Sequence, residues 1–155
     1  MAQLRTWLTN DLAANTKPYV FVFGHEPAFP YNRHIGDSLD AHPANRDAFW
    51  QVLEDEDVQA FFVGHTHYYS SHQGDKNGIG DVWQFDAGNA GNDPGDGKTF
   101  FDVTVGSLTA TIDVWRDGGT GNFTKTGSFT VIPEPASLGL LAVGGLLALL
   151  RRRHR

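Results

Sequence analysis

Two short apolar runs, each followed by Gly-His, constrain the fold of this chain more than any other feature. Residues 19–23 read YVFVF and residues 60–63 read AFFV. Continuous β-prone runs of this length are typical of strands buried on both faces of a parallel sheet. Residues 46–58, which lie between the two runs, have the apolar spacing of a helix. This strand–helix–strand order predicts an α/β layer in which the two strands are parallel.

Two helices are predicted, one before the first run and one after it. Residues 1–17 carry apolar side chains at helical spacing, and residues 46–58 carry them on one side with acidic residues opposite. Pro43 precedes the second helix, and we expect Asn45 to cap it. The predicted apolar positions are Leu4, Trp7, Leu8 and Leu12 in the first helix and Phe49, Trp50 and Leu53 in the second.

The second half of the chain predicts mainly β-structure. A further short strand is expected near residues 82–85. Residues 98–116 alternate between apolar and polar on both sides of Gly106-Ser107, which predicts a β-hairpin with a tight turn. The glycine-rich residues 117–127 are expected to be a flexible connector. One more strand is possible in residues 128–135, and there is no internal repeat.

Charge and composition exclude several classes of function. The formal net charge of the 155 residues is −6, although residues 151–155 hold four of the twelve basic side chains. The remaining body is therefore strongly acidic and poorly suited to neutralising a nucleic-acid backbone, so no nucleic-acid partner is expected. The chain contains no cysteine, which excludes disulfides and cysteine-based zinc sites.

Three histidines are placed where a metal site is expected. His25 and His65 each follow a glycine at the carboxyl end of a predicted strand, and ligands of open α/β sheets bind outside those ends. His67 lies two residues further on, so an extended backbone would direct it to the same side as His65. Three neutral imidazoles suit Zn, Fe or Mn. The alternative for His25 alone is a loop or core histidine with a single hydrogen bond.

The other candidates are less sharply defined. His34 and His42 lie in a polar loop, where they are either solvated or in contact with a substrate phosphate. Tyr68 either lines a pocket or packs against its neighbours. We take His34 and Tyr68 as the candidates for a substrate pocket, and we expect His72 to lie on the surface.

The motifs around these histidines resemble those of the calcineurin-like metallophosphoesterases, including the purple acid phosphatase branch. Residues 22–25, VFGH, are similar to the Val-x-x-His motif of that family, and residues 64–67, GHTH, are similar to its closing Gly-His-x-His motif. The resemblance extends over about residues 2–115. It implies a four-layer α/β/β/α sandwich with two metal ions, Fe, Zn or Mn. By this resemblance His25 and His65 would bind one ion and His67 the other.

The resemblance also implies an activity. Members of the family hydrolyse phosphoesters with water activated by the two metals, so the expected substrate is a phosphorylated small molecule or polymer. The early family motifs Asp-x-His, Gly-Asp and Gly-Asn-His, which supply a bridging aspartate and a general-acid histidine, have no counterpart before His25. We therefore expect residues 1–132 to be the carboxyl-terminal part of a metallophosphoesterase domain, with no catalytic residue of its own and inactive by itself.

The carboxyl terminus, residues 133–155, resembles a PEP-CTERM protein-sorting signal. A Pro-Glu-Pro element precedes an apolar stretch at residues 136–150 and a basic end. As a helix this stretch would be about 22 Å long, which is short for a hydrocarbon core of about 30 Å. The resemblance implies an exosortase-type protease as partner. It also implies export to the envelope or exterior of a Gram-negative bacterium, with transient membrane anchoring through residues 136–150.

Two other functions stay open at this point. The chain is alternatively a non-catalytic cell-surface module whose histidines are vestigial or hold a single metal. A third possibility is calcium binding by the acidic, glycine-rich residues 86–98, although this loop lacks the regular ligand spacing of a calcium site.

Overall fold

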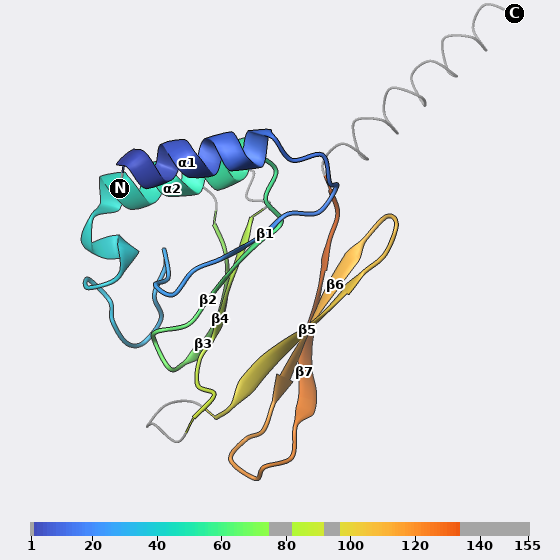
Figure 1. Cartoon of the computed structure of the whole chain (residues 1–155). Coiled ribbons are helices and arrows are strands. Elements are labelled where there is room, and N and C mark those ends of the chain that lie inside the picture. Colours follow the sequence, from blue (N-terminus) through green and yellow to red (C-terminus); the bar gives the residue numbers. More distant parts are fainter. Residues whose placement is uncertain (1, 75–81, 92–96, 134–155) are drawn as a thin grey trace, which may run out of the picture.

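The structure is a computed structural model that describes residues 2–74, 82–91 and 97–133, and its fold is mixed α/β with two sheets and few helices (Figure 1). The first half of the chain forms α1 (Ala2–Ala13), β1 (Phe21–Phe23), a 3-10 turn at Leu39–Ala41, α2 (Pro43–Asp55) and β2 (Ala60–Val63). The second half forms β3 (Tyr69–Gln73), β4 (Trp83–Ala87), β5 (Thr99–Val105), β6 (Ala110–Arg116) and β7 (Thr124–Val131).

The first sheet has the strand order β1-β2-β4-β3. Strand β2 pairs parallel to both β1 and β4, whereas β3 pairs antiparallel to β4. The parallel pairing expected from the sequence is therefore confirmed. It brings the carboxyl ends of β1 and β2 to the same edge of the sheet.

Alternate side chains of β2 separate two cores. Phe61 and Val63 face α1 and α2, while Ala60 and Phe62 face the second sheet. The second sheet is antiparallel, in the order β5-β6-β7, and its inward side chains include Ile112. The described residues thus form three layers, helices on a mixed sheet on an antiparallel sheet. The fourth layer of the expected sandwich is not formed by these residues.

The burial of the helices' apolar residues was predicted in part. Phe49, Trp50 and Leu53 of α2 are buried as predicted, and so are Leu8 and Leu12 of α1. Leu4 and Trp7 are instead 54% and 59% exposed, because only one side of α1 rests on the core. The prediction of Asn45 as cap is wrong: α2 begins at Pro43, which is pre-shaped for a first helical turn, and its cap position is His42.

Two predictions for the strands need correction, and one strand was missed. The run at residues 19–23 forms only the three-residue β1, and Phe23 is 75% exposed because β1 is an edge strand rather than a central one. Strand β3 was not predicted, since its polar sequence YSSHQ lacks an apolar alternation. Part of the predicted connector belongs to β7, which begins at Thr124.

The predicted hairpin is confirmed. Strands β5 and β6 pair in register from Thr99 opposite Arg116 to Val105 opposite Ala110. The turn is closed by the N–H of Gly106, which donates to the carbonyl of Thr109 at 2.9 Å. The strands expected near residues 82–85 and in residues 128–135 also exist, as β4 and the end of β7.

Candidate metal site

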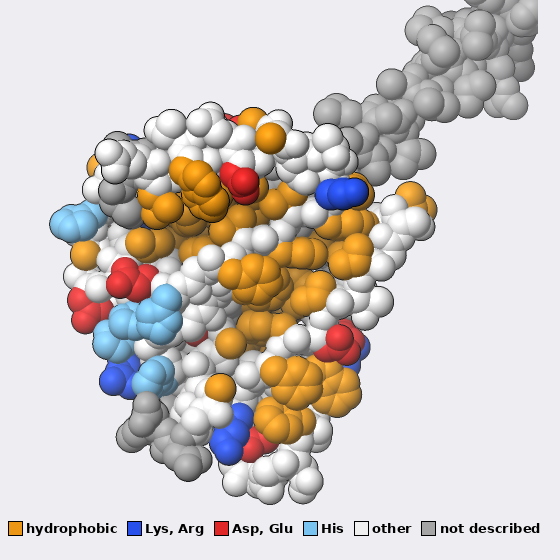
Figure 2. Space-filling view, in the orientation of Figure 1, with side chains coloured by type: hydrophobic (Ala, Val, Ile, Leu, Met, Phe, Trp, Pro, Cys, Tyr) orange, Lys and Arg blue, Asp and Glu red, His pale blue; other side chains and the backbone are white. Residues whose placement is uncertain are grey.

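Histidine side chains gather on one side of the molecule, with acidic and basic side chains around them (Figure 2). They come from the loops that follow β1 and β2. The backbone ladder continues past both strands, because Gly24 N donates to Phe62 O at 2.9 Å and Gly64 N donates to His25 O at 3.1 Å. These two bonds hold the Gly-His segments side by side.

His25 and His65 are in direct contact. Nε2 of His25 lies 3.2 Å from Nδ1 of His65, and the rings meet edge to face with centroids 4.9 Å apart. His25 is exposed and His65 is half-buried. The contact allows a hydrogen bond when one ring donates and the other accepts, which requires that at least one of them is neutral.

His34 lies on the other side of His65. Their ring centroids are 4.1 Å apart at an interplanar angle of 33°. Nδ1 of His34 is also 3.2 Å from both carboxylate oxygens of Asp37. In the part of the chain that the structure describes, His34, Asp37 and His65 are the one group of three potential ligands whose atoms all lie within 4.8 Å of one another.

His67 has a different environment. Its Nδ1 lies 3.0 Å from a terminal guanidinium nitrogen of Arg33. Because a guanidinium only donates, Nδ1 of His67 must accept, and a neutral ring then carries its proton on Nε2. The expectation of an extended backbone between His65 and His67 is wrong: their φ angles of 74° and 61° bend the chain into left-handed turns.

Positive φ angles are concentrated around this site. Among the described residues other than glycine, they occur at Asn32, His34, His65, His67 and, away from the site, Asp57. A side chain at positive φ costs about 1–2 kcal/mol, and such strained residues cluster at functional sites. The strain here falls on three of the histidines that the sequence singled out.

A buried aspartate supports the loop that carries His65 and His67. Asp86 at the end of β4 is fully buried, and it accepts hydrogen bonds from Thr66 Oγ1 at 2.7 Å and from Gly88 N at 2.8 Å. Burial raises the pKa of the Asp86 carboxyl, and the bonds from Thr66 and Gly88 oppose this rise. This role was not predicted, because Asp86 was assigned to the acidic, glycine-rich residues 86–98, far along the chain from the histidine motifs.

A buried glutamine fixes the loop that carries His25. The side-chain oxygen of Gln84 accepts from the N–H groups of Ala28 and Phe29 at 2.7 and 3.0 Å, and its amide donates to Phe29 O at 2.8 Å. Gln84 has no exposed surface. A glutamine between the aromatic residues Trp83 and Phe85 was the available signal that this strand anchors a loop.

The remaining candidates lie around this cluster. Tyr68 is half-buried, and its backbone N–H donates to Thr66 Oγ1 at 3.2 Å. His42 is exposed. His72 lies on the exposed part of β3, as expected, although its ring packs 4.5 Å from that of Phe29 and partial burial lowers the pKa of its imidazole.

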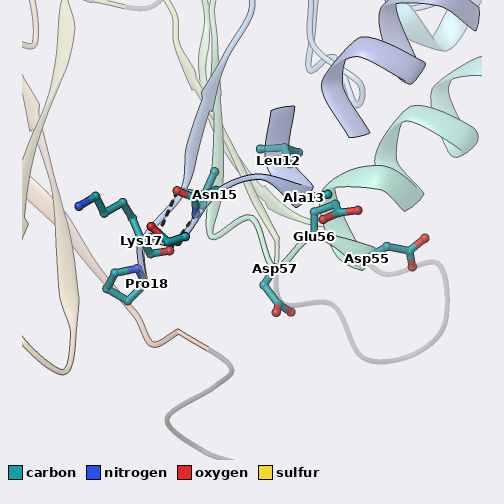
Figure 3. A pocket seen from close by; sticks show the side chains of 10 residues that line it. Leu12, Ala13, Asn15, Lys17, Pro18, Asp55, Glu56 and Asp57 are labelled. Atoms are coloured by element: carbon teal, nitrogen blue, oxygen red, sulfur yellow. Dashed lines mark hydrogen bonds between the residues drawn. The ribbon is translucent and has the colours of Figure 1, made fainter. Parts of the chain in front are cut away.

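A cavity of about 420 Å³ lies elsewhere, between the end of α1, the start of β1 and the end of α2 (Figure 3). Asn15, Lys17, Asp55 and Asp57 are among its lining residues, and no histidine is. Asn15 bonds to the backbone of Lys17, which closes a local turn. The cavity is therefore separate from the histidine cluster.

Comparison with known proteins identifies the carboxyl terminus. Residues 131–154 match the PEP-CTERM protein-sorting motif, which confirms that prediction. The motif marks an exported protein that is anchored at its carboxyl terminus and implies recognition by an exosortase. Residues 134–155, including the apolar stretch 136–150, lie outside the described residues; within the described ones, every helix is too short or too polar to cross a membrane.

No curated protein matches the chain. Among solved structures, a double mutant of Vps29 from Entamoeba histolytica is similar, with a TM-score of 0.40 and 18% identity. The match covers 55% of this chain and 46% of the Vps29 chain. This chain therefore spans less than half the length of that protein. A likeness at this level does not define a function.

Proposed function

We propose that this chain is the carboxyl-terminal part of an exported, metal-dependent phosphoester hydrolase with a four-layer α/β/β/α fold. The observation that carries the proposal is the contact between His25 and His65, whose facing nitrogens are 3.2 Å apart at the ends of parallel strands. The motifs VFGH and GHTH, which resemble those of the calcineurin-like metallophosphoesterases, supply these two residues. Within that family, the proposal places the chain in the purple acid phosphatase branch.

In this proposal His25 and His65 are ligands of one metal ion and His67 of a second, with Fe, Zn or Mn as the ions. Bound metals would supply an activated water and neutralise the charge of the phosphoryl oxygens. Asp86 and Thr66 hold the loop that presents His65 and His67. Upstream residues would add the bridging carboxylate and the general-acid histidine.

Substrate contact falls to side chains at the rim of the cluster. Arg33 uses one N–H for His67, and the other N–H groups of a guanidinium are suited to phosphoryl oxygens. His34 and Tyr68 are the further pocket candidates, for a phosphorylated small molecule or polymer. Sorting would involve an exosortase-type protease and transient anchoring through residues 136–150 in the envelope of a Gram-negative bacterium.

A second candidate function is a non-catalytic surface module with one metal. It is favoured by the group of His34, Asp37 and His65, which belongs entirely to this chain. The calcium-binding alternative receives no such support: residues 92–96 of its acidic loop lie outside the described residues, and Asp86 is committed to Thr66 and Gly88.

The test is metal content and aryl phosphate hydrolysis of the exported protein. His65→Ala and His67→Ala should each remove most of the activity, whereas His42→Ala, at an exposed position directly before α2, should not. The 155-residue chain alone should hydrolyse the substrate weakly even with Zn, Mn or Fe. Unchanged turnover in both ligand variants would refute the proposed roles.

A further inference from the structure

We propose that His34, Asp37 and His65 form a site for a single divalent transition-metal ion that is complete within this chain. The site differs from the one proposed above, because it uses His34 and Asp37 as ligands and does not use His67. It also needs no residue outside the chain. The proposal does not depend on phosphoester hydrolysis.

The geometry of the three side chains is close to that of a bound site. Tetrahedral zinc, with bonds of about 2.0–2.1 Å, places its ligand atoms about 3.4 Å apart. Nδ1 of His34 and the carboxylate of Asp37 are already 3.2 Å apart, and all three ligand atoms lie within 4.8 Å of one another. Only a small contraction is needed, and the Asp37 side chain, which is 65% exposed, is free to make it.

The donor types suit such an ion. Two imidazoles and one carboxylate form a common three-ligand set, and three protein ligands leave an open coordination position. His25 contacts His65 at 3.2 Å, so it is placed either to orient that ligand or to approach the ion itself. Imidazoles bind a metal in their neutral form, so the carboxylate gives such a ligand set a negative charge that attracts a cation.

The loop that carries His34 and Asp37 is held in shape by its own hydrogen bonds. Ser38 Oγ donates to His34 O at 3.1 Å. The carboxylate of Asp40 accepts from Gly36 N at 2.7 Å and from Ser38 N at 3.2 Å. These bonds fix the turn that puts residues 34 and 37 on the same side. The ligands therefore need little ordering when the ion binds.

Arg33 explains why His67 is not among the proposed ligands of this site. Its permanent positive charge lies 3.0 Å from Nδ1 of His67, so a cation at His67 would need the additional ligands of the hydrolase proposed above. The group around His65, in contrast, contains the carboxylate of Asp37. Local charge thus favours a cation at His34, Asp37 and His65 over one at His67.

The test is calorimetric titration of the full chain with Zn²⁺, and with Co²⁺ as a spectroscopic probe of the ligands. One ion should bind per chain. His34→Ala and Asp37→Asn should each weaken binding by at least about tenfold and change the visible absorption of bound Co²⁺. The control His42→Ala, at an exposed position, should leave the affinity within about twofold.

Circular dichroism and thermal melting of each variant show whether it folds, and both substituted side chains lie at or near the surface. Absence of Zn²⁺ and Co²⁺ binding by the unaltered chain would overturn the proposal. So would unchanged affinity in His34→Ala and Asp37→Asn, or a loss confined to His67→Ala. Because the readout is binding rather than turnover, a failure here is distinct from a failure of the hydrolase proposal.

Discussion

Nε2 of His25 and Nδ1 of His65 face each other across 3.2 Å, although forty positions separate the two residues in the chain. The parallel pairing of β1 with β2 and the two hydrogen bonds beyond the strand ends produce this contact. The buried side chains of Asp86 and Gln84 then fix the loops on either side. Each of these two supports can be removed without changing a histidine.

Replacing Asp86 by Ala should destabilise the chain by about 1–3 kcal/mol, because Thr66 Oγ1 and Gly88 N lose a buried acceptor. Urea unfolding measures the change. Asp102→Ala on the exposed side of β5 is the matched control and should have little effect. A loss no larger than that of the control would contradict the supporting role.

Gln84→Leu should free the loop after His25. The substitution keeps a similar volume but leaves two N–H groups and one carbonyl, at Ala28 and Phe29, without their partner. Each unsatisfied group costs about 1–3 kcal/mol. Amide hydrogen exchange should accelerate at residues 28 and 29, and not in Gln73→Leu on the exposed part of β3. Equal protection in both variants would argue against the tether.

Gly74→Ala should be more disruptive than Gly64→Ala. A Cβ at position 74 would collide with the buried indole of Trp50, whereas position 64 has no heavy atom within 4 Å of such a Cβ. Overpacking of this kind costs about 1–3 kcal/mol. Thermal melting of the two variants gives the comparison, and equal melting temperatures would show that the indole moves aside without cost.

Asp117 should make stability depend on pH at the acidic end. The N–H groups of Gly119 and Lys98 donate to its carboxylate and hold the pKa below the ordinary value of 3.8. A carboxyl whose pKa is lowered by folding stabilises the protein at pH values above its ordinary pKa. This stabilisation is lost as the pH falls through the folded-state pKa. The stability gap between the native chain and Asp117→Asn should therefore shrink from about pH 6 to about pH 2 in urea titrations. A constant gap would contradict this assignment.

Removal of residues 133–155 should change where the protein is found, because it takes away most of the sorting motif at residues 131–154. The fold should stay intact, because the last strand, β7, ends at Val131. Fractionation of cells and medium gives the distribution, and melting of the truncated protein checks the fold. If the truncated and complete proteins had the same distribution, the motif would not act as a sorting signal here.

The sequence predicted those parts of the fold in which local pattern and tertiary role agree. Strand β2 is buried on both faces, as its continuous apolar run predicted. Strand β1 has a similar run but lies at the sheet edge, and edge position depends on which strands assemble beside it rather than on its own residues. Strand β3 is polar and forms by pairing with β4, so it had no local signal.

The candidate site was predictable to a similar degree. Gly-His after each apolar run was enough to bring His25 and His65 together, because parallel strands end at the same edge. The partnership of His34 with Asp37 and His65 was not predictable, since it depends on the turn of a long polar loop. The contact of Arg33 with His67 depends on the same loop. The metal-ligand roles themselves stay predictions.

Strand β1 has a practical consequence for handling the protein. Among the described residues, only one of its two edges is paired, and Phe23, whose ring stacks on that of Phe62, is largely exposed. An unpaired strand edge beside an exposed aromatic side chain can pair with an additional strand. That strand can come from a second copy of the protein as well as from another partner. Concentrated samples should therefore self-associate through this unpaired edge, and Phe23→Lys should reduce the self-association.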